Sequence, residues 1–284
     1  MATVLEVLNK SSKNLLSINI KTAKIDSEII LASVLNTNRI NLTTKRNLVL
    51  NKSQELLMSQ LIRRRLNKEP VAYILNKKDF WNETYFVDKR VLIPRPETEI
   101  LIEMVLKKIK NKSEVLQIMD IGCGSGCLLI SCLRELKKSI GIGLDISSDA
   151  LEVSKVNVKN YNLNKRIELY KESIFTFSTL KKLDIILSNP PYLSSSEYDN
   201  LEEDVKNFEP KTALKGGYNG TLHYKRIIIF AALSLKKNGL LALELGDQQF
   251  LKIKEILIKN SFRILDKYRL INGEIRCILA SKIT

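Results

Sequence analysis

The chain has 284 residues, of which 44% are hydrophobic and 27% charged, and its formal net charge is +15. This is the composition of a globular chain with enough apolar material for a core, and the length allows one large domain with a smaller second one. The sequence contains no apolar run of transmembrane length, and its amino terminus does not form a secretory signal, so we expect a cytoplasmic protein that does not bind membranes.

The cysteine and histidine content narrows the possible chemistry. Cys123, Cys127 and Cys132 lie close together, but their spacing does not match that of a zinc pair. We interpret them, with Cys277, as reduced thiols in a core. His223 is the single histidine, which excludes zinc sites that use two histidines. We expect no metal, and a packing or surface role for His223.

The positive charge is concentrated near the amino end. Residues 1–78 hold fourteen lysines and arginines against five acidic residues, and the rest of the chain is closer to balance. A basic excess is typical of proteins that bind nucleic acid or an acidic partner. The cluster Arg63-Arg64-Arg65 equally fits one solvated helix face, and an AT-rich genome would favour lysine codons, so the charge alone does not identify a partner.

Residues 1–75 have the pattern of a small helical domain. Apolar side chains recur at helical spacing in three runs, which begin near Val4, Ile25 and Leu56, and Pro70 ends the last of them. We therefore predict a helical N-terminal domain over residues 1–75.

Aromatic and β-branched residues crowd the next stretch, around Asn82-Glu83. This pattern predicts a short β-hairpin, which we assign as a connector over residues 76–93. The segment Ile93–Glu99 then ends the strand pattern with two prolines and opens a helix that reaches about Lys110.

From residue 115 onward, short apolar strands alternate with amphipathic helices. Strands are predicted at 115–120, 140–145, 167–170, 183–188 and 239–245, helices at 128–136, 148–161, 223–236 and 249–259, and a closing hairpin at 263–270 and 275–280. Such alternation favours a parallel sheet with helices on both faces. We therefore predict an α/β, Rossmann-like domain over residues 94–284.

The first of these strands runs into a glycine-rich loop, Gly122-Cys123-Gly124-Ser125-Gly126, which precedes a helix. Glycines allow a tight turn and a close approach of the backbone to a ligand, and the helix presents its N-terminus there. The next strand ends in Asp145, whose carboxylate can accept both hydroxyls of a ribose. We predict that this loop and Asp145 bind a cofactor that contains adenosine.

The spacing of the glycines distinguishes between two cofactors. Dinucleotide enzymes place the third glycine three residues after the second. Here Gly126 comes two residues after Gly124, and Asp120 precedes the loop. This variant resembles the Rossmann-like methyltransferases, and the resemblance implies S-adenosylmethionine as the cofactor.

The strand at 183–188 ends in Asn189-Pro190-Pro191-Tyr192, at the sheet edge where parallel α/β proteins bind ligands. The prolines remove backbone donors, which leaves the Asn189 side-chain oxygen and the Pro190 carbonyl as acceptors. Two fixed acceptors can take the hydrogens of an amide or amine, aim its nitrogen at a cofactor methyl group and stabilise developing positive charge. The Tyr192 ring can pack on the planar group. We predict Asn189, Pro190 and Tyr192 as catalytic residues.

Other segments resemble the PrmC/HemK family of protein-(glutamine-N5) methyltransferases, which act on peptide chain release factors. Glu69–Leu75 with Phe80-Trp81 resembles the family's interdomain segment, and Ile93–Glu99 resembles the start of its catalytic domain. Phe208–Leu214, followed by Gly216-Gly217 and Gly220, is characteristic of the family. The resemblance covers nearly the whole chain.

This resemblance implies methyl transfer from S-adenosylmethionine to the side-chain nitrogen N5 of the glutamine in a release factor's Gly-Gly-Gln motif. It implies that the helical N-terminal domain contacts the release factor, and that the glycine loop, Asp145 and Asn189 contact the cofactor. It also implies that the substrate-binding segment is Asn189, Pro190, Pro191 and Tyr192. Near the adenine the family has an acidic residue followed by a bulky one. Here that stretch is Glu172–Phe175, and the offset from Asn189 favours Ile174.

Two alternatives remain open at this point. A nucleic-acid amino-methyltransferase, acting on adenine N6 or guanine N2, could use the same tetrapeptide and would suit the basic charge, but it needs a groove-binding or base-flipping element. The helical first domain and the family-specific segments argue against it, so we expect no stable nucleic-acid partner. A non-catalytic binding module is disfavoured by the intact glycine loop, Asp145 and tetrapeptide.

Overall fold

The computed structural model describes residues 1–283. They form two compact units, the first made of residues 1–76 with 202–208, and the second of residues 77–201 with the chain from 209 onward. None of the helices in this range is long and apolar enough to cross a membrane.

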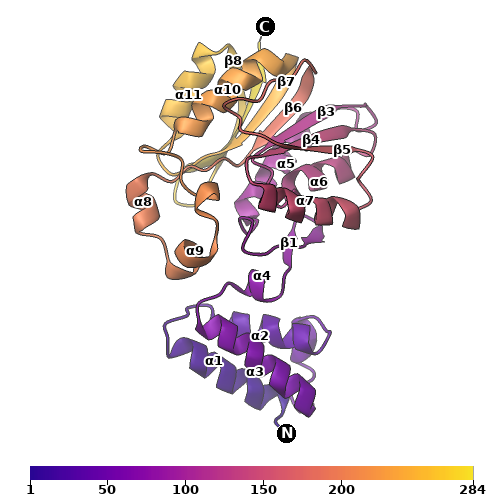
Figure 1. Ribbon diagram of the computed structural model, residues 1–284, viewed down its shortest axis with the longest axis vertical. Helices are drawn as coiled ribbons and strands as arrows, with labels where there is room; N and C mark the ends of the chain where they lie inside the picture. The colour runs from indigo at the N-terminus through magenta and orange to yellow at the C-terminus, as the bar shows by residue number, and fades with distance from the viewer. Residues whose placement is uncertain (284) are drawn as a thin grey trace. The chain divides into compact units, whose positions relative to one another are not determined.

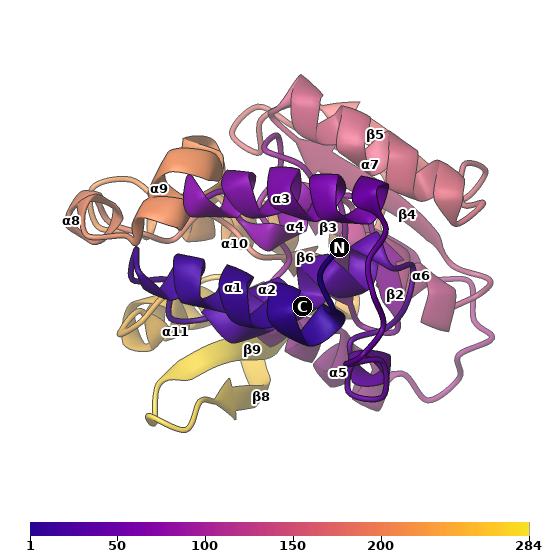
Figure 2. The ribbon, with the colours of Figure 1, turned by 90° about the horizontal axis from the view of Figure 1, so that it is seen from below.

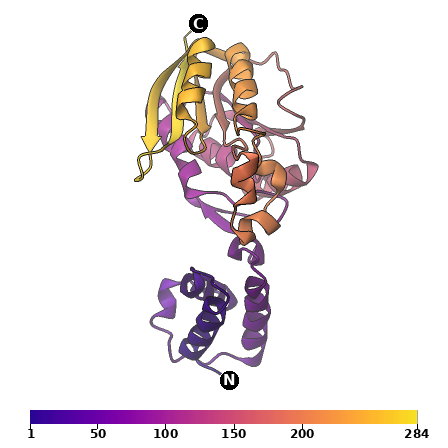
Figure 3. The same ribbon diagram turned by 90° about the vertical axis from the view of Figure 1, so that its left-hand side faces the viewer.

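The first unit is a small helical bundle, whose helices pack side by side (Figure 3). Its elements are α1 (Val4–Leu16), α2 (Ala23–Val34), η1 (Ile40–Leu42), α3 (Lys52–Leu66), α4 (Val71–Ile74) and α9 (Glu203–Phe208). Capping boxes begin α1 at Thr3 and α3 at Asn51, where each side chain accepts a backbone N–H of the first turn. Buried apolar residues such as Leu15, Leu31 and Met58 form its core.

The basic cluster on α3 is not a uniform solvated face. Arg65 is 5% exposed; its Nε donates to Asp26 Oδ2 at 2.7 Å, and its Nη2 lies 3.6 Å from Asp204 Oδ2. Arg64 forms a bidentate pair with Glu69, at 2.7 and 2.6 Å. Two of the three arginines are therefore engaged in structural ion pairs, and they do not add to a free basic surface.

The second unit opens with the hairpin of β1 (Lys78–Phe80) and β2 (Glu83–Tyr85). Its main sheet has the order β5-β4-β3-β6-β7-β9-β8. The strands are β3 (Gln117–Ile121), β4 (Ile140–Asp145), β5 (Ile167–Lys171), β6 (Leu183–Ser188), β7 (Leu235–Glu244), β8 (Phe262–Arg269) and β9 (Ile275–Lys282). The first five strands in this order, from β5 to β7, run parallel to one another, and β9 runs antiparallel to both of its neighbours.

The order of the strands creates a crevice at one edge of the sheet. The chain runs outward from β3 through β4 to β5, then returns to place β6 on the other side of β3. The connections that follow β3 and β6 therefore run toward opposite edges of the sheet. In sheets of this kind, ligands bind between two such strands, beyond their carboxyl ends.

Helices cover both faces of the sheet (Figures 1 and 2). On one face lie η2 (Pro96–Thr98), α5 (Glu99–Lys108), α6 (Cys127–Glu135) and α7 (Ser148–Asn160), and on the other α10 (Leu222–Ser234) and α11 (Phe250–Lys259). Successive strand residues point to opposite faces, so Ile118 and Ile185 join the core with α5 and α6 while Met119 and Ile186 join the core with α10 and α11. The predicted α/β fold class is confirmed.

Some element boundaries differ from the sequence-based expectation. The helix expected at 223–236 ends at Ser234, and β7 begins at Leu235 rather than at Gly239. Leu235 is extended and 1% exposed, and it pairs with Leu183 of β6, so tertiary burial overrides the local helical pattern. Between β6 and α10, the short elements α8 (Ser195–Asp199) and η3 (Lys211–Ala213) had no periodic signal.

Candidate active site

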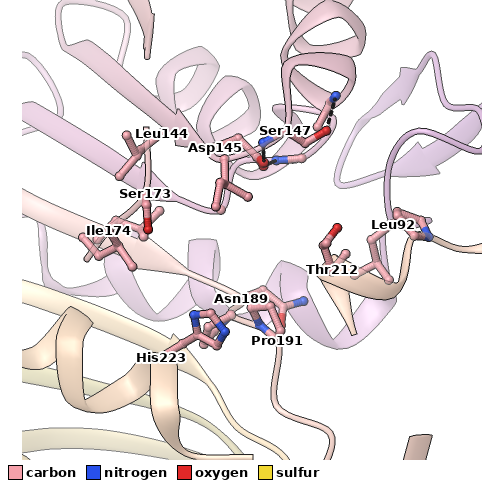
Figure 4. A pocket seen from close by; sticks show the side chains of 18 of the residues that line it. Leu92, Leu144, Asp145, Ser147, Ser173, Ile174, Asn189, Pro191, Thr212 and His223 are labelled. Atoms are coloured by element: carbon pink, nitrogen blue, oxygen red, sulfur yellow. Dashed lines mark hydrogen bonds between the residues drawn. The ribbon is translucent and has the colours of Figure 1, made fainter. Parts of the chain in front are cut away.

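A cavity of the second unit lies at the crevice between the two halves of the sheet. Its volume is about 200 Å³. Figure 4 shows Asp145 and Ser147 on one side of it and Asn189, Pro191 and His223 on the other. The lining residues come from Arg90–Leu92, Ile121, Gly122, Gly124, Leu144–Ser147, Ala150, Glu172–Phe175, Asn189–Pro191, Pro210, Thr212, Ala213, His223 and Ile227.

Asp145, the last residue of β4, is held by two backbone donors. Its Oδ2 accepts from Gly124 N and its Oδ1 from Ser147 N, each at 2.9 Å. Burial raises the pKa of Asp145, although these two bonds act in the opposite direction. A carboxylate offers about four acceptor positions, so acceptor capacity remains for a ligand in the cavity.

The glycine loop presents two of its residues to the cavity. Gly122 and Gly124 have φ of +76° and +54°, and a Cβ added at either would meet nothing within 4 Å. Gly126 differs, because a Cβ there would lie 3.2 Å from Ser154 Oγ, so this glycine permits close packing of α6 on α7. Cys123 and Ser125 are 5% and 3% exposed and do not line the cavity.

Asn189 follows β6 and lines the cavity with Pro190 and Pro191. Its Nδ2 donates to Thr98 Oγ1 at 3.1 Å. Its Oδ1 is buried and has no hydrogen-bond partner. A buried amide oxygen without a hydrogen-bond donor costs folding free energy. Because this oxygen belongs to a residue of the cavity wall, it can accept an N–H of a ligand.

Tyr192 does not line the cavity. Its ring lies 5.7 Å from the guanidinium of Arg276, and its backbone carbonyl accepts from Gln249 Nε2 at 2.8 Å. Burial raises the pKa of the Tyr192 hydroxyl, so the phenol is neutral. The tetrapeptide thus places Asn189 and the two prolines at the cavity, and a stacking role for Tyr192 stays a prediction.

The stretch after β5 forms another wall. All four residues from Glu172 to Phe175 line the cavity, and Ile174 is 7% exposed. Phe175 packs edge-on against His223, with ring centroids 5.6 Å apart. Burial lowers the pKa of His223, so the imidazole is neutral. Sequence reasoning missed His223 as a cavity residue, since nothing around an isolated histidine distinguishes a wall from a surface.

The remaining wall joins two segments that are far apart in the sequence. Glu209 is 5% exposed; its Oε2 accepts from Ile93 N at 3.1 Å and its Oε1 from Arg95 Nη2 at 2.5 Å. These contacts are flanked by two segments that line the cavity, Arg90–Leu92 on one side and Pro210, Thr212 and Ala213 on the other. The carboxylate therefore fixes the two segments against each other.

Comparison with known proteins identifies the family. Residues 6–75 match the PrmC N-terminal domain and residues 96–207 the methyltransferase small domain. The chain is 35% identical over 266 residues to the release factor glutamine methyltransferase of Clostridium botulinum, covering 93% of this chain and 94% of that protein. The chain belongs to the release factor glutamine methyltransferase family.

Other relatives extend this picture. The bifunctional methyltransferase of Rickettsia felis is 32% identical over 307 residues, which cover 99% of this chain. The chain spans 58% of the length of that relative. Among solved structures, a methyltransferase from Pyrococcus furiosus superposes with a TM-score of 0.53 at 17% identity, over 80% of this chain and all of that one; this similarity concerns the fold.

The family assignment agrees with the location of the site. The methyltransferase domain match spans the glycine loop, Asp145 and the tetrapeptide, and the match to the PrmC N-terminal domain spans the helices of the first unit up to residue 75. The predicted resemblance to the release factor glutamine methyltransferases is confirmed at the level of the family by the relatives that match most of the chain.

Proposed function

We propose that this chain transfers the methyl group of S-adenosylmethionine to N5 of the glutamine in the Gly-Gly-Gln motif of a peptide chain release factor. The carrying observation is the amide of Asn189, whose unpartnered oxygen lies at the wall of a cavity that also holds Asp145 and the open glycines. Membership of the release factor glutamine methyltransferase family supports the choice of a protein glutamine over a nucleobase.

The residues present fit the cofactor. Asp145 keeps acceptor capacity after its two backbone bonds, which suits the hydroxyls of a ribose. The space beside Gly122 and Gly124 is open at the positions where side chains would stand. The wall of Glu172–Phe175 offers apolar surface for a flat base. We assign cofactor contacts to Gly122 and Gly124 of the glycine loop, Asp145, Ile174 and Asn189.

When bound, S-adenosylmethionine supplies an electrophilic methyl group on a sulfonium sulfur. The nitrogen of a glutamine amide is a weak nucleophile, because its lone pair is delocalised into the carbonyl, and it carries two hydrogens. Asn189 Oδ1 and the Pro190 carbonyl can accept those hydrogens and fix the direction of the nitrogen lone pair. They would also stabilise positive charge on nitrogen as the C–N bond forms and the bond between the methyl carbon and sulfur breaks. One N–H proton then passes to solvent, and S-adenosylhomocysteine leaves as a neutral thioether.

We further propose a division of labour along the chain. Residues 1–75 dock the release factor, residues 76–93 connect, and residues 94–284 carry the chemistry. One glutamine offers few contacts, so affinity for the protein substrate must come from a remote surface. The exposed part of the helical unit is the candidate for that surface.

Mass spectrometry of a purified release factor tests the function. The factor is incubated with the enzyme and a cofactor that carries a labelled methyl group, and the modified residue is located by peptide fragmentation. We expect one labelled methyl on the glutamine of the Gly-Gly-Gln motif. Label in RNA or DNA, with none on the release factor, would overturn the proposal in favour of a nucleic-acid amino-methyltransferase.

A further inference from the structure

Three side chains from three separate elements form a hydrogen-bonded chain that ends at the cavity. Glu244 is the last residue of β7, Thr98 ends η2, and Asn189 follows β6. Thr98 Oγ1 donates to Glu244 Oε2 at 2.5 Å, and Asn189 Nδ2 donates to Thr98 Oγ1 at 3.1 Å. Glu244 and Thr98 are 1% and 5% exposed, so water does not replace these bonds.

The direction of the chain follows from proton counting. An ionised carboxylate can only accept, and a threonine hydroxyl has one proton to donate. Thr98 therefore gives its proton to Glu244 and has only lone pairs left for Asn189. The Asn189 amide must then turn its NH₂ group toward Thr98, and its oxygen is the atom left without a partner. The negative charge of Glu244 is therefore sufficient to fix the orientation of the Asn189 amide.

We propose that Glu244 and Thr98 are positioning residues, which hold the Asn189 amide with its oxygen available to accept an N–H of the substrate. This inference rests on the proposed function. With the amide turned over, Asn189 would present NH₂ to the NH₂ group of a glutamine, and two donors would face each other. The pair thus selects the one orientation of Asn189 that binds the target nitrogen.

The same geometry makes the orientation sensitive to pH. Burial raises the pKa of Glu244 to about 7, against the opposing effect of the bond from Thr98. Once protonated, Glu244 can donate to Thr98, which then has a proton for the Asn189 oxygen, and the amide is free to turn over. The other groups that interact with Glu244 are Arg276, Glu97, Arg95, Tyr192, Tyr224 and Cys277.

The titration of these neighbouring groups does not account for a step in activity near pH 7. Burial raises the pKa of the Tyr192, Tyr224 and Cys277 side chains far above neutrality. His223 lines the same cavity, but its pKa is lowered from 6.5. A step in activity near pH 7 that disappears when Glu244 is changed therefore belongs to Glu244.

The first test compares two substitutions of Thr98. Thr98→Val removes the hydroxyl and should lower kcat at least about ten-fold. Its KM for the release factor and its affinity for the cofactor should stay within about two-fold of the wild-type values. Thr98→Ser keeps the hydroxyl and should retain most of the wild-type kcat. Ser131→Ala is the matched control, because Ser131 is buried and bonded to Tyr85 OH at 2.6 Å on α6, away from the cavity. A kcat of Thr98→Val equal to that of Thr98→Ser would overturn the proposal.

The second test is the pH profile of Glu244→Gln. A glutamine can accept from Thr98 but cannot titrate. We expect kcat of the wild type to fall as the pH drops through about 7, and the Glu244→Gln profile to lack this step. Retention of the same step in Glu244→Gln would contradict the inference, since the step would then arise from another group.

A third measurement does not depend on methyl transfer, and so separates this inference from the proposed function. In ¹⁵N-labelled protein the side-chain NH₂ pair of Asn189, assigned by its absence in Asn189→Asp, should shift with pH near 7 in the wild type. It should not titrate there in Glu244→Gln or Thr98→Val. An Asn189 pair with the same shifts in wild type and Thr98→Val at every pH would contradict the positioning role, whether or not the enzyme methylates a release factor.

Discussion

The carboxylate of Asp145 has two roles that a single residue can combine. It accepts from Gly124 N and Ser147 N at 2.9 Å, so it ties the glycine loop to the start of α7. It also lines the cavity with unused acceptor positions. The loop is therefore held in an open form by the same group that we expect to bind the ribose.

Replacing Asp145 tests the ligand-binding role. Bonds from ribose hydroxyls to a charged acceptor contribute about 1.5–3 kcal/mol, so Asp145→Ala should weaken S-adenosylmethionine binding about ten- to a hundred-fold. Calorimetry measures this directly. Asp149→Ala, a nearby exposed acid on α7, should leave the affinity unchanged, and an equal affinity of Asp145→Ala and wild type would remove Asp145 from the site.

Asp120, which precedes the glycine loop, makes a different prediction. It is 1% exposed, its Oδ2 has no partner, and burial, aided by the charge of Asp145, raises its pKa to about 8. The unfolded chain has the ordinary pKa of 3.8, so folding favours the protonated acid. The stability from this difference is present at low pH and is lost as the pH rises through about 8.

Asp120→Asn carries a neutral side chain at every pH. We expect the wild type to lose at least about 5 °C of its unfolding midpoint between pH 6 and pH 9, and Asp120→Asn to lose distinctly less. Circular dichroism melts at the two values compare them. Identical pH slopes in the two proteins would show that Asp120 is already ionised in the folded state.

At the scale of elements, the periodic parts of the second unit were predictable. The β3–loop–α6 passage and the position of Asp145 at the end of β4 follow from apolar strands, glycines and turn residues that lie next to each other in the sequence. Such local patterns predict the secondary structure of residues that are close in the sequence. They locate the glycine loop and the tetrapeptide at the same edge of the sheet without any knowledge of side-chain contacts.

The long-range contacts of the site were not predictable from spacing. Thr98 is bonded to Glu244, 146 residues away in the sequence, and to Asn189, 91 residues away. Glu244 ends an apolar strand, and nothing in the sequence around it distinguishes it from an exposed acid. No local pattern links Tyr192 with Arg276 either, although the guanidinium lies 5.7 Å from the centre of the tyrosine ring. Only the folded chain defines these pairings.

Glu209 makes a second set of long-range contacts, and it supports the wall of the cavity formed by Pro210, Thr212 and Ala213. Glu209→Ala removes the partner of Ile93 N and of Arg95, and buried bonds to charged groups contribute about 1.5–3 kcal/mol. We expect faster hydrogen exchange across residues 209–215 and weaker cofactor binding. Glu202→Ala, an exposed acid in the first unit, is the control, and unchanged exchange in Glu209→Ala would contradict the clamp.

At the scale of the whole molecule, the first unit has exposed basic side chains that are not engaged in the ion pairs described above. Lys10 on α1 and Arg63 on α3 are exposed and line one hollow between these helices. Arg64 and Arg65, by contrast, are engaged by Glu69 and Asp26. Removing residues 1–75 would be a poor test of docking, because Glu202–Phe208 packs within the same unit and would lose its partners.

Charge reversal keeps the bundle intact and tests the docking role. Lys10→Glu with Arg63→Glu should raise KM for an intact release factor about ten-fold, since charges at the rim of an interface govern association, while kcat and cofactor affinity stay at wild-type values. Lys13→Glu with Lys45→Glu changes the net charge equally at exposed positions outside the hollow and should have a smaller effect. Steady-state kinetics at two salt concentrations measure both, and the difference should shrink at high salt as the charges are screened. Equal KM values for the two double variants would mean that the hollow does not receive the release factor, because only total charge would then matter.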